Sequence, residues 1–188
     1  MAESPLRIGV LAVQGGFAAH IAHLASVEAV GVEVRTPADL EGLDGLILPG
    51  GESTTITMGI ESAGLAAPIR EHHEAGRPVL GTCAGMIVAD REHLDLIDIT
   101  TKRNAFGRQL ASFEDDIELK EIADGPVHGV FIRAPWVEEV GTGVEVLAEV
   151  RDHPVAVRQG TVTAISFHPE LTEDNRVHRW FVESIGSA

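Results

Sequence analysis

The sequence has one cysteine, Cys83, and few positive charges. A single cysteine excludes an internal disulfide and fits a reducing compartment. Lysine and arginine together number 14 against 29 aspartate and glutamate residues, which gives a formal net charge of −15. Nucleic-acid phosphates and anionic lipid surfaces repel such an acidic chain. We therefore expect no nucleic acid and no membrane among its partners.

Long apolar runs are also missing. No run approaches the ~20 residues that a membrane-spanning helix needs. Residues 1–5, MAESP, have neither the basic nor the apolar region of a signal peptide. Together with the cysteine usage, these absences predict a cytoplasmic protein. A length of 188 residues with 44% hydrophobic residues is typical of one globular domain, which we expect to span residues 1–188.

The first half of the chain alternates short apolar runs with segments of helical periodicity. Strands are predicted at residues 6–13, 32–35, 44–48 and 78–82. Phe17, Ile21, Leu24 and Ala25 recur at the spacing of one helix face, and further helices are predicted at 53–60 and 65–75. Gly31 is expected to end the first helix. This alternation is typical of a parallel sheet covered by helices on both faces.

The second half has a different pattern. Extended runs at 144–150, 154–159 and 162–167 are separated by turn residues and indicate antiparallel strands. Val177, Trp180, Phe181 and Ile185 share one face of a predicted closing helix. Residues 90–128 give no clear pattern. We predict an α/β fold of three layers, a doubly wound, mostly parallel, flavodoxin-like sheet with antiparallel additions in the second half.

Cys83 lies between two apolar runs, in the segment Gly-Thr-Cys-Ala-Gly. A strand, a tight turn and the first turn of a helix account for this pattern, with Cys83 at a strained apex and its side chain exposed. Gly81 and Gly85 allow strand and helix to approach closely. The helix N-terminus favours a thiolate, and the Ala84 N–H is free to face an oxyanion. The alternative is a buried structural cysteine.

His168 ends the last predicted strand and is followed by Pro169 and Glu170. Open α/β sheets place their sites at the carboxyl ends of strands. Glu170 is positioned to accept a hydrogen bond from the imidazole and hold its useful tautomer. Cys83, His168 and Glu170 then form a nucleophile, a base and an orienting acid. An ordinary surface turn is the alternative for the His-Pro-Glu segment on its own.

The third candidate is the glycine turn at residues 49–54, Pro-Gly-Gly-Glu-Ser-Thr. Unshielded N–H groups and the following helix N-terminus attract anions. The Gly51 N–H is a candidate partner for that of Ala84 in an oxyanion hole, and Gly51, Glu52 and Ser53 are candidates to hold a small amino acid. Ser53 is expected to cap the helix. A glycine turn with no ligand is the alternative.

These three motifs together resemble the class I, or triad, glutamine amidotransferases. Further segments narrow the resemblance to the glutaminase subunits of pyridoxal 5′-phosphate synthase, the PdxT/SNO family. They are residues 12–16 (AVQGG), 103–109 (RNAFGRQ) with 112–114 (SFE), and 131–135 (FIRAP). The resemblance covers the chain from Ile8 to about Ile185. The chain departs from many relatives in Gly16, where they carry alanine, and in a short segment before Arg103.

The resemblance implies hydrolysis of L-glutamine to L-glutamate and ammonia through a γ-glutamyl thioester on Cys83. His168 passes a proton to the leaving ammonia and then activates water, while Glu170 orients His168. The resemblance also assigns glutamine binding to the segment Gly51–Ser53, to Arg103 and to the segment Ile132–Arg133. An arginine fork suits the α-carboxylate of the substrate, although solvated surface charges are the alternative for Arg103 and Arg133.

The same resemblance implies no cofactor, no metal, and one protein partner. That partner is the barrel-fold, oligomeric synthase subunit, which receives the ammonia and builds pyridoxal 5′-phosphate. Three other functions stay open: a glutaminase subunit of another pathway, such as histidine biosynthesis, a non-catalytic regulatory module, and a different thiol hydrolase built on the same turn at Cys83. The remaining histidines, His20 and His23 among them, show no zinc-binding spacing and are interpreted as surface or packing residues.

Overall fold

The central sheet is formed by the apolar runs of the first half together with the last strands of the chain. We describe a computed structural model that covers residues 4–107 and 112–186. The strands are β1 (Arg7–Leu11), β2 (Val30–Val34), β3 (Gly45–Leu48), β4 (Val79–Thr82), β5 (Ile99–Lys102), β6 (Ser112–Ile117), β7 (Val127–Ile132), β8 (Trp136–Val140), β9 (Glu145–Val150), β10 (His153–Gln159) and β11 (Val162–Ile165). The α-helices are α1 (Phe17–Ser26), α2 (Ser53–Ser62), α3 (Ala66–Glu74), α4 (Ala84–Ala89) and α5 (Arg176–Gly186).

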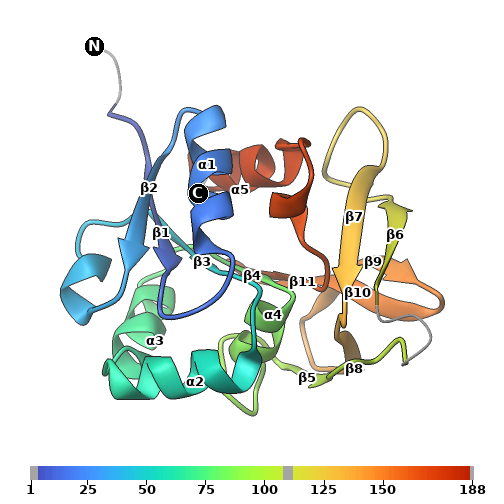
Figure 1. The fold of residues 1–188 in the computed structure, drawn as a ribbon, viewed down its shortest axis with the longest axis horizontal. Coiled ribbons are helices and arrows are strands. Elements are labelled where there is room, and N and C mark those ends of the chain that lie inside the picture. The colour runs from blue at the N-terminus through green and yellow to red at the C-terminus, as the bar shows by residue number, and fades with distance from the viewer. Residues whose placement is uncertain (1–3, 108–111, 187–188) are drawn as a thin grey trace.

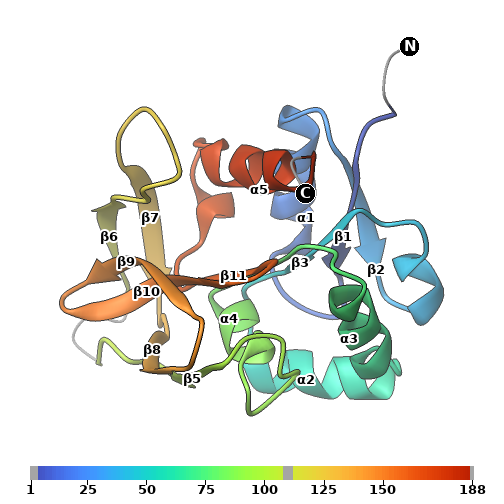
Figure 2. The same ribbon diagram turned by 180° about the vertical axis from the view of Figure 1, so that it is seen from behind.

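Within the described residues the main sheet has seven strands in the order β2-β1-β3-β4-β11-β10-β9. The first five are parallel, whereas β10 pairs antiparallel with both β11 and β9. Helices α1 and α5 cover one face, and α2, α3 and α4 cover the other (Figures 1 and 2). The predicted α/β fold, with a mostly parallel sheet and antiparallel additions, is confirmed.

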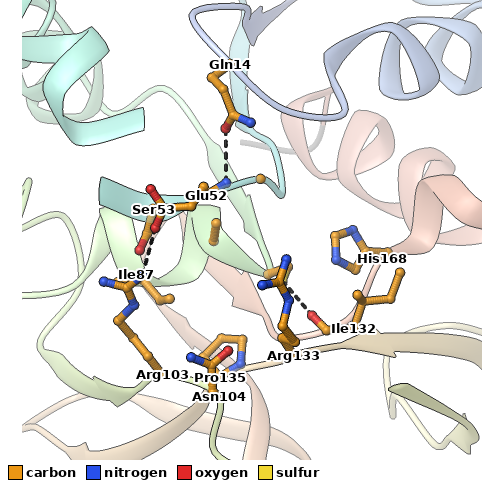
Figure 3. A pocket seen from close by; sticks show the side chains of 13 residues that line it. Gln14, Glu52, Ser53, Ile87, Arg103, Asn104, Ile132, Arg133, Pro135 and His168 are labelled. Atoms are coloured by element: carbon orange, nitrogen blue, oxygen red, sulfur yellow. Dashed lines mark hydrogen bonds and ion pairs between the residues drawn. The ribbon is translucent and has the colours of Figure 1, made fainter. Parts of the chain in front are cut away.

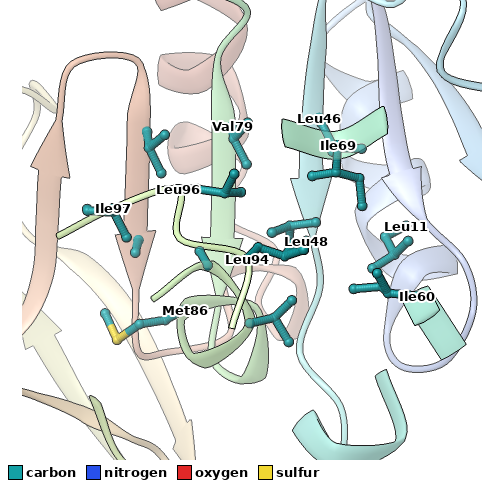
Figure 4. Close-up of a cluster of buried hydrophobic side chains, with 14 of the residues drawn as sticks. Leu11, Leu46, Leu48, Ile60, Ile69, Val79, Met86, Leu94, Leu96 and Ile97 are labelled. Carbon is teal, nitrogen blue, oxygen red and sulfur yellow. The ribbon is translucent and has the colours of Figure 1, made fainter. Parts of the chain in front are cut away.

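Alternating side chains of the strands supply a core on each face of the sheet. One cluster packs Leu46, Leu48 and Val79 against α2, α3 and α4 (Figure 4). The other packs Ile8, Ile47 and neighbouring strand residues against α1 and α5. These two layers fix the carboxyl ends of β3, β4 and β11, where the candidate site lies.

Three details differ from the sequence prediction. Gly31 does not end the first helix but lies inside β2, opposite Ile8 of β1. Ala25 is exposed, and His20 is buried in its place together with Leu24 on the inner face of α1. The run 162–167 was expected to be antiparallel, but β11 also pairs parallel with β4 and therefore belongs to the parallel part of the sheet.

Residues 90–128, which gave no clear sequence pattern, contain β5 and β6. Strand β5 pairs with β8, and β6 forms a hairpin with β7, so both are antiparallel ribbons beside the main sheet. Phe131 of β7 is fully buried and stacks on Phe113 of β6 with ring centroids 4.5 Å apart. Arg108 and Gln109 of the family-like segment lie outside the described residues. None of the described helices has the length and apolar character required to span a membrane.

Candidate functional site

Cys83 is the apex of the sharp turn between β4 and α4. Its backbone has φ 49° and ψ −107°, a left-handed conformation that is strained for a residue with a side chain. The Cys83 N–H donates to Ile165 O of β11 at 2.8 Å, which ties the apex to the neighbouring strand. A Cβ at Gly81 would lie 2.7 Å from the Gly85 carbonyl oxygen, so glycine is required there as predicted. The prediction of an exposed side chain was wrong, since Cys83 is only 6% exposed.

His168 follows β11 and faces the same point. Its Nδ1 lies 2.7 Å from Glu170 Oε1, and its backbone N–H donates to Val130 O at 2.9 Å. Burial by itself would lower the pKa of His168, but hydrogen bonds to Cys83 and Glu170, together with their negative charges, outweigh burial and raise the pKa to about 10. The imidazole is therefore charged at neutral pH. An imidazolium beside a cysteine sulfur favours the nucleophilic thiolate.

Glu170 lies behind His168, in a short 3₁₀ turn over Pro169–Leu171, and its side chain is 2% exposed. Burial would raise the pKa of this carboxyl, but the hydrogen bond from His168 and the positive charge of that ring lower it overall. A Cβ placed on Gly16 would lie 3.2 Å from Glu170 Oε1, so the carboxylate also approaches the N-terminus of α1. That end of a helix favours a negative charge.

The glycine turn after β3 forms the opposite wall. Glu52, not Ser53, caps α2: its carboxylate accepts from the Thr54 and Thr55 N–H groups at 3.2 and 2.8 Å. The predicted Ser53 cap was wrong because Ser53 is already the first helical residue, and Glu52 reaches both free N–H groups. These hydrogen bonds, led by those from Thr55, lower the pKa of Glu52 to about 2.

Gln14 holds this turn in place. Its Oε1 accepts from the Glu52 N–H at 3.0 Å, and the Gly16 N–H donates to Gly50 O at 3.0 Å. A Cβ on Gly50 would meet the His168 ring, with Nδ1 at 2.8 Å, and Cys83 Cβ at 3.3 Å. The turn, the nucleophile candidate and the base candidate are thus in direct contact.

Arg103 lies across the pocket from His168 (Figure 3). Its Nη2 is 2.7 Å from Glu52 Oε1, and its Nη1 donates to Thr54 Oγ1 at 3.1 Å. Arg133 has a left-handed backbone with φ 44°, next to Ile132, whose carbonyl oxygen lies 3.9 Å from Cys83 Sγ. The two arginines come from different segments and supply the only cations among the described residues that line this pocket, apart from a protonated His168.

These groups surround one pocket of about 370 Å³, a size suited to a small ligand. The residues that line it are Gln14, Gly51, Glu52, Ser53, Cys83, Ala84, Ile87, Arg103, Asn104, Ile132, Arg133, Pro135 and His168 (Figure 3). Every candidate site residue from the sequence lines this pocket except Glu170, which contacts it through His168. Ala84 is the first residue of α4, where a backbone N–H has no partner within the helix.

Sequence reasoning did not assign a site role to Ile87, Asn104 or Pro135, and it interpreted His20 as a surface or packing histidine. Asn104 and Pro135 lie inside the family-like segments, and Ile87 lies four positions after Cys83. Proximity to these motifs was therefore a usable signal. His20 is fully buried, and its Nε2 lies 3.4 Å from Glu170 Oε2. Nothing in the sequence connects these two distant residues.

Comparisons with known proteins cover nearly the whole chain. The family model of the SNO glutamine amidotransferase family matches residues 10–187. A pyridoxal 5′-phosphate synthase subunit PdxT of Nocardia farcinica is 50% identical over 201 residues, which cover 100% of this chain and 89% of the relative. The subunit of the same name from Streptomyces avermitilis is 52% identical over 187 residues, covering 95% of this chain and 93% of the relative. A solved structure described as a glutamine amidotransferase superposes with a TM-score of 0.89 at 47% identity, covering 95% of this chain and 98% of the other.

Proposed function

The chain belongs to the SNO glutamine amidotransferase family, and we propose that it hydrolyses L-glutamine and delivers the ammonia to a pyridoxal 5′-phosphate synthase subunit. The observation that carries the proposal is the contact of Cys83, His168 and the Gly50–Gly51 turn at one pocket, with Glu170 hydrogen-bonded behind His168. Residues of three family-like segments line this pocket, among them Gln14, Arg103 and Arg133. The chain covers 89% and 93% of two relatives named pyridoxal 5′-phosphate synthase subunit PdxT.

In the proposed reaction the Cys83 sulfur attacks the side-chain amide carbon of glutamine. The bond from that carbon to nitrogen breaks, and protonated His168 gives its proton to the leaving ammonia, which leaves a γ-glutamyl thioester. Neutral His168 then takes a proton from water, whose oxygen attacks the thioester carbonyl. Glutamate leaves as Cys83 recovers its thiolate and His168 its charge. Glu170 orients His168 and stabilises the imidazolium in both steps.

We infer that the backbone N–H groups of Gly51 and Ala84 form the oxyanion hole, since both residues line the pocket beside Cys83. We also infer that Gly51, Glu52 and Ser53 hold glutamine, with Arg103, Ile132 and Arg133 on the other walls. The forked guanidinium of Arg103 matches the α-carboxylate of the substrate. The guanidinium is bound to Glu52 and Thr54, so the substrate carboxylate has to share it.

The proposal includes a heteromeric complex in the cytoplasm. The chain, a single glutamine amidotransferase domain over residues 1–188, docks on a barrel-fold, oligomeric synthase subunit that uses the ammonia. The segment Gln14–Gly16 is positioned to couple docking to the site, because Gln14 holds Glu52 and the Gly16 N–H holds Gly50. Movement of this segment would shift the turn that contacts His168 and Cys83.

The test is glutamate release from L-glutamine by the wild-type chain, with and without a pyridoxal 5′-phosphate synthase subunit, alongside Cys83→Ala. We expect release that the partner stimulates and that Cys83→Ala abolishes. Release that does not respond to the partner would instead indicate a glutaminase of another pathway. No release from a chain that is folded and docked would reject the enzyme and leave a regulatory module.

A further inference from the structure

A buried pair of histidines lies behind the proposed Cys83–His168–Glu170 set. His20 of α1 and His178 of α5 are both 0% exposed, and His20 Nδ1 lies 2.9 Å from His178 Nε2. The other ring nitrogen of His20, Nε2, lies 3.2 Å from Thr82 Oγ1 and 3.4 Å from Glu170 Oε2. Thr82 directly precedes Cys83, so His20 contacts Glu170 and also the residue before the proposed nucleophile. Burying an imidazole completely costs free energy unless its polar atoms are hydrogen-bonded.

The contacts assign one tautomer to each ring. His178 Nδ1 is buried without a hydrogen-bond partner, so a proton there would be an unpaired buried donor. His178 therefore carries its proton on Nε2 and donates it to His20 Nδ1. His20 then has its own proton on Nε2, the nitrogen that faces Glu170 Oε2. The opposite tautomer would aim a lone pair at a carboxylate and leave an orphan N–H on His178.

Within residues 4–107 and 112–186, the Glu170 carboxylate has no other partner for its second oxygen. Oε1 is bound to His168 Nδ1 at 2.7 Å, whereas Oε2 is buried and makes no direct hydrogen bond of good geometry. The His20 N–H, shared with Thr82 at 3.4 Å from Oε2, is the donor that faces it. A buried carboxylate oxygen without such a donor would be free to rotate away from His168.

His20 stays neutral in this position. The titratable groups that face it are Glu170, His168, His23 and His178. Burial lowers the pKa of His20 to about 4, against the opposing effect of the Glu170 charge. Burial and the two neighbouring histidines likewise lower the pKa of His178. Consequently His20 donates a proton toward Glu170 without competing with His168 as a second cation.

We propose that His20 is a positioning residue: its Nε2–H holds the second oxygen of Glu170, so that the first oxygen stays on His168, and His178 fixes the tautomer that makes this possible. The inference rests on the proposed function of Cys83, His168 and Glu170. It adds a residue from the first helix that no family-like motif in the sequence contains.

The test uses two substitutions and one matched control. His20→Leu removes the donor, whereas His20→Gln places an amide N–H near the position of Nε2. His72→Leu is the control, because His72 is also buried and has no partner for either ring nitrogen, but it lies on α3 away from Glu170. Each variant is assayed for kcat and KM of glutamate release in the complex. Iodoacetamide alkylation of the single cysteine is followed against pH in the isolated chain.

We expect His20→Leu to lower kcat about tenfold or more with little change in KM, since small displacements of acting groups cost this much. The pH at which alkylation of Cys83 begins should move upward in this variant, because a loosely held imidazolium stabilises the thiolate less. His20→Gln should recover most of both losses, and His72→Leu should show neither. Wild-type kinetics for His20→Leu, or a His20→Gln variant as impaired as His20→Leu, would overturn the proposal.

A measurement on the wild-type chain decides the matter even when His20→Leu does not fold. Nitrogen-15 NMR of the histidine side chains reports the tautomer of each ring. We expect His20 to be neutral with its proton on Nε2, and a proton on Nδ1 would overturn the proposal. A wild-type chain that releases no glutamate with its partner would reject the proposed function instead. The tautomer and the pH dependence of alkylation would still test the positioning role of His20.

Discussion

Gly50 is the residue of the glycine turn that faces the proposed nucleophile and base. Replacing it tests how closely the turn, Cys83 and His168 must fit. A Cβ at this position would lie 2.8 Å from His168 Nδ1 and 3.3 Å from Cys83 Cβ. Ordinary contacts begin at 3.4 Å, and Cε1 of the same ring would lie closer still than Nδ1, so the imidazole has to move by more than 0.6 Å, the difference between 3.4 and 2.8 Å. The φ angle of Gly50 is not positive, so alanine strains the site by contact and not by its own backbone.

We therefore expect Gly50→Ala to fold, with a small change in thermal stability, and to lose kcat. A misplacement near 1 Å costs about a hundredfold in rate, so a loss between roughly tenfold and a hundredfold is expected, with KM close to wild type. The assay is glutamate release in the presence of the synthase subunit. Iodoacetamide alkylation of Cys83 is a second measure, because it reports how well His168 supports the thiolate.

Gly186→Ala is the matched control, because a Cβ there would meet nothing within 4 Å. It should behave as the wild-type chain in both assays. A Gly50→Ala variant that is folded and retains wild-type kcat would refute the reasoning. That result would mean that the imidazole has room to move without loss of function, so that the contact with Gly50 has no bearing on the chemistry.

Two further predictions concern charge at the site. The raised pKa of His168 stabilises the fold fully below pH 6.5, and this contribution is lost as the pH rises towards about 10. Because Glu170→Gln removes one of the charges that raise that pKa, the melting temperature of the variant should fall less steeply across this window, as followed by circular dichroism; parallel curves would contradict this. Arg103→Lys exchanges a fork for a point charge, so KM for glutamine should rise about tenfold with little change in kcat. An unchanged KM in the glutamate assay would show that Arg103 does not bind the substrate.

The sharp turn at Cys83 and the parallel sheet were predictable because their causes are local. Gly81 and Gly85 lie where any Cβ would meet backbone, and this requirement appears directly in the sequence. The apolar runs of the parallel strands likewise reflect burial on both faces. The fold class and the candidates at Cys83, in the glycine turn and in the His-Pro-Glu segment follow from such local signals. Arg103, Ile132 and Arg133 were candidates only through the family resemblance.

The incorrect or missing predictions have non-local or competing causes. Glu52 caps α2 in place of Ser53 because a longer carboxylate reaches two N–H groups at once, and Ser is the commoner capping residue. Gly31 follows a helix as a terminating glycine would, but pairing with β1 draws it into β2. His20 shares the helix face of Phe17 and Leu24, so its position is compatible with burial, but an imidazole there needs a polar partner. That partner is His178, 158 positions away, which no periodicity can reveal.

The pairing of β4 with β11 has a consequence for how the protein is made. Val79 of the strand that leads to Cys83 lies opposite Val162 of the strand that leads to His168. Synthesis proceeds at roughly 5–20 residues per second, so several seconds separate the appearance of these two strands. A nascent or prematurely terminated chain therefore carries the thiol without its imidazole. The proposed glutaminase therefore cannot release ammonia until translation has passed His168 and β11 has paired with β4.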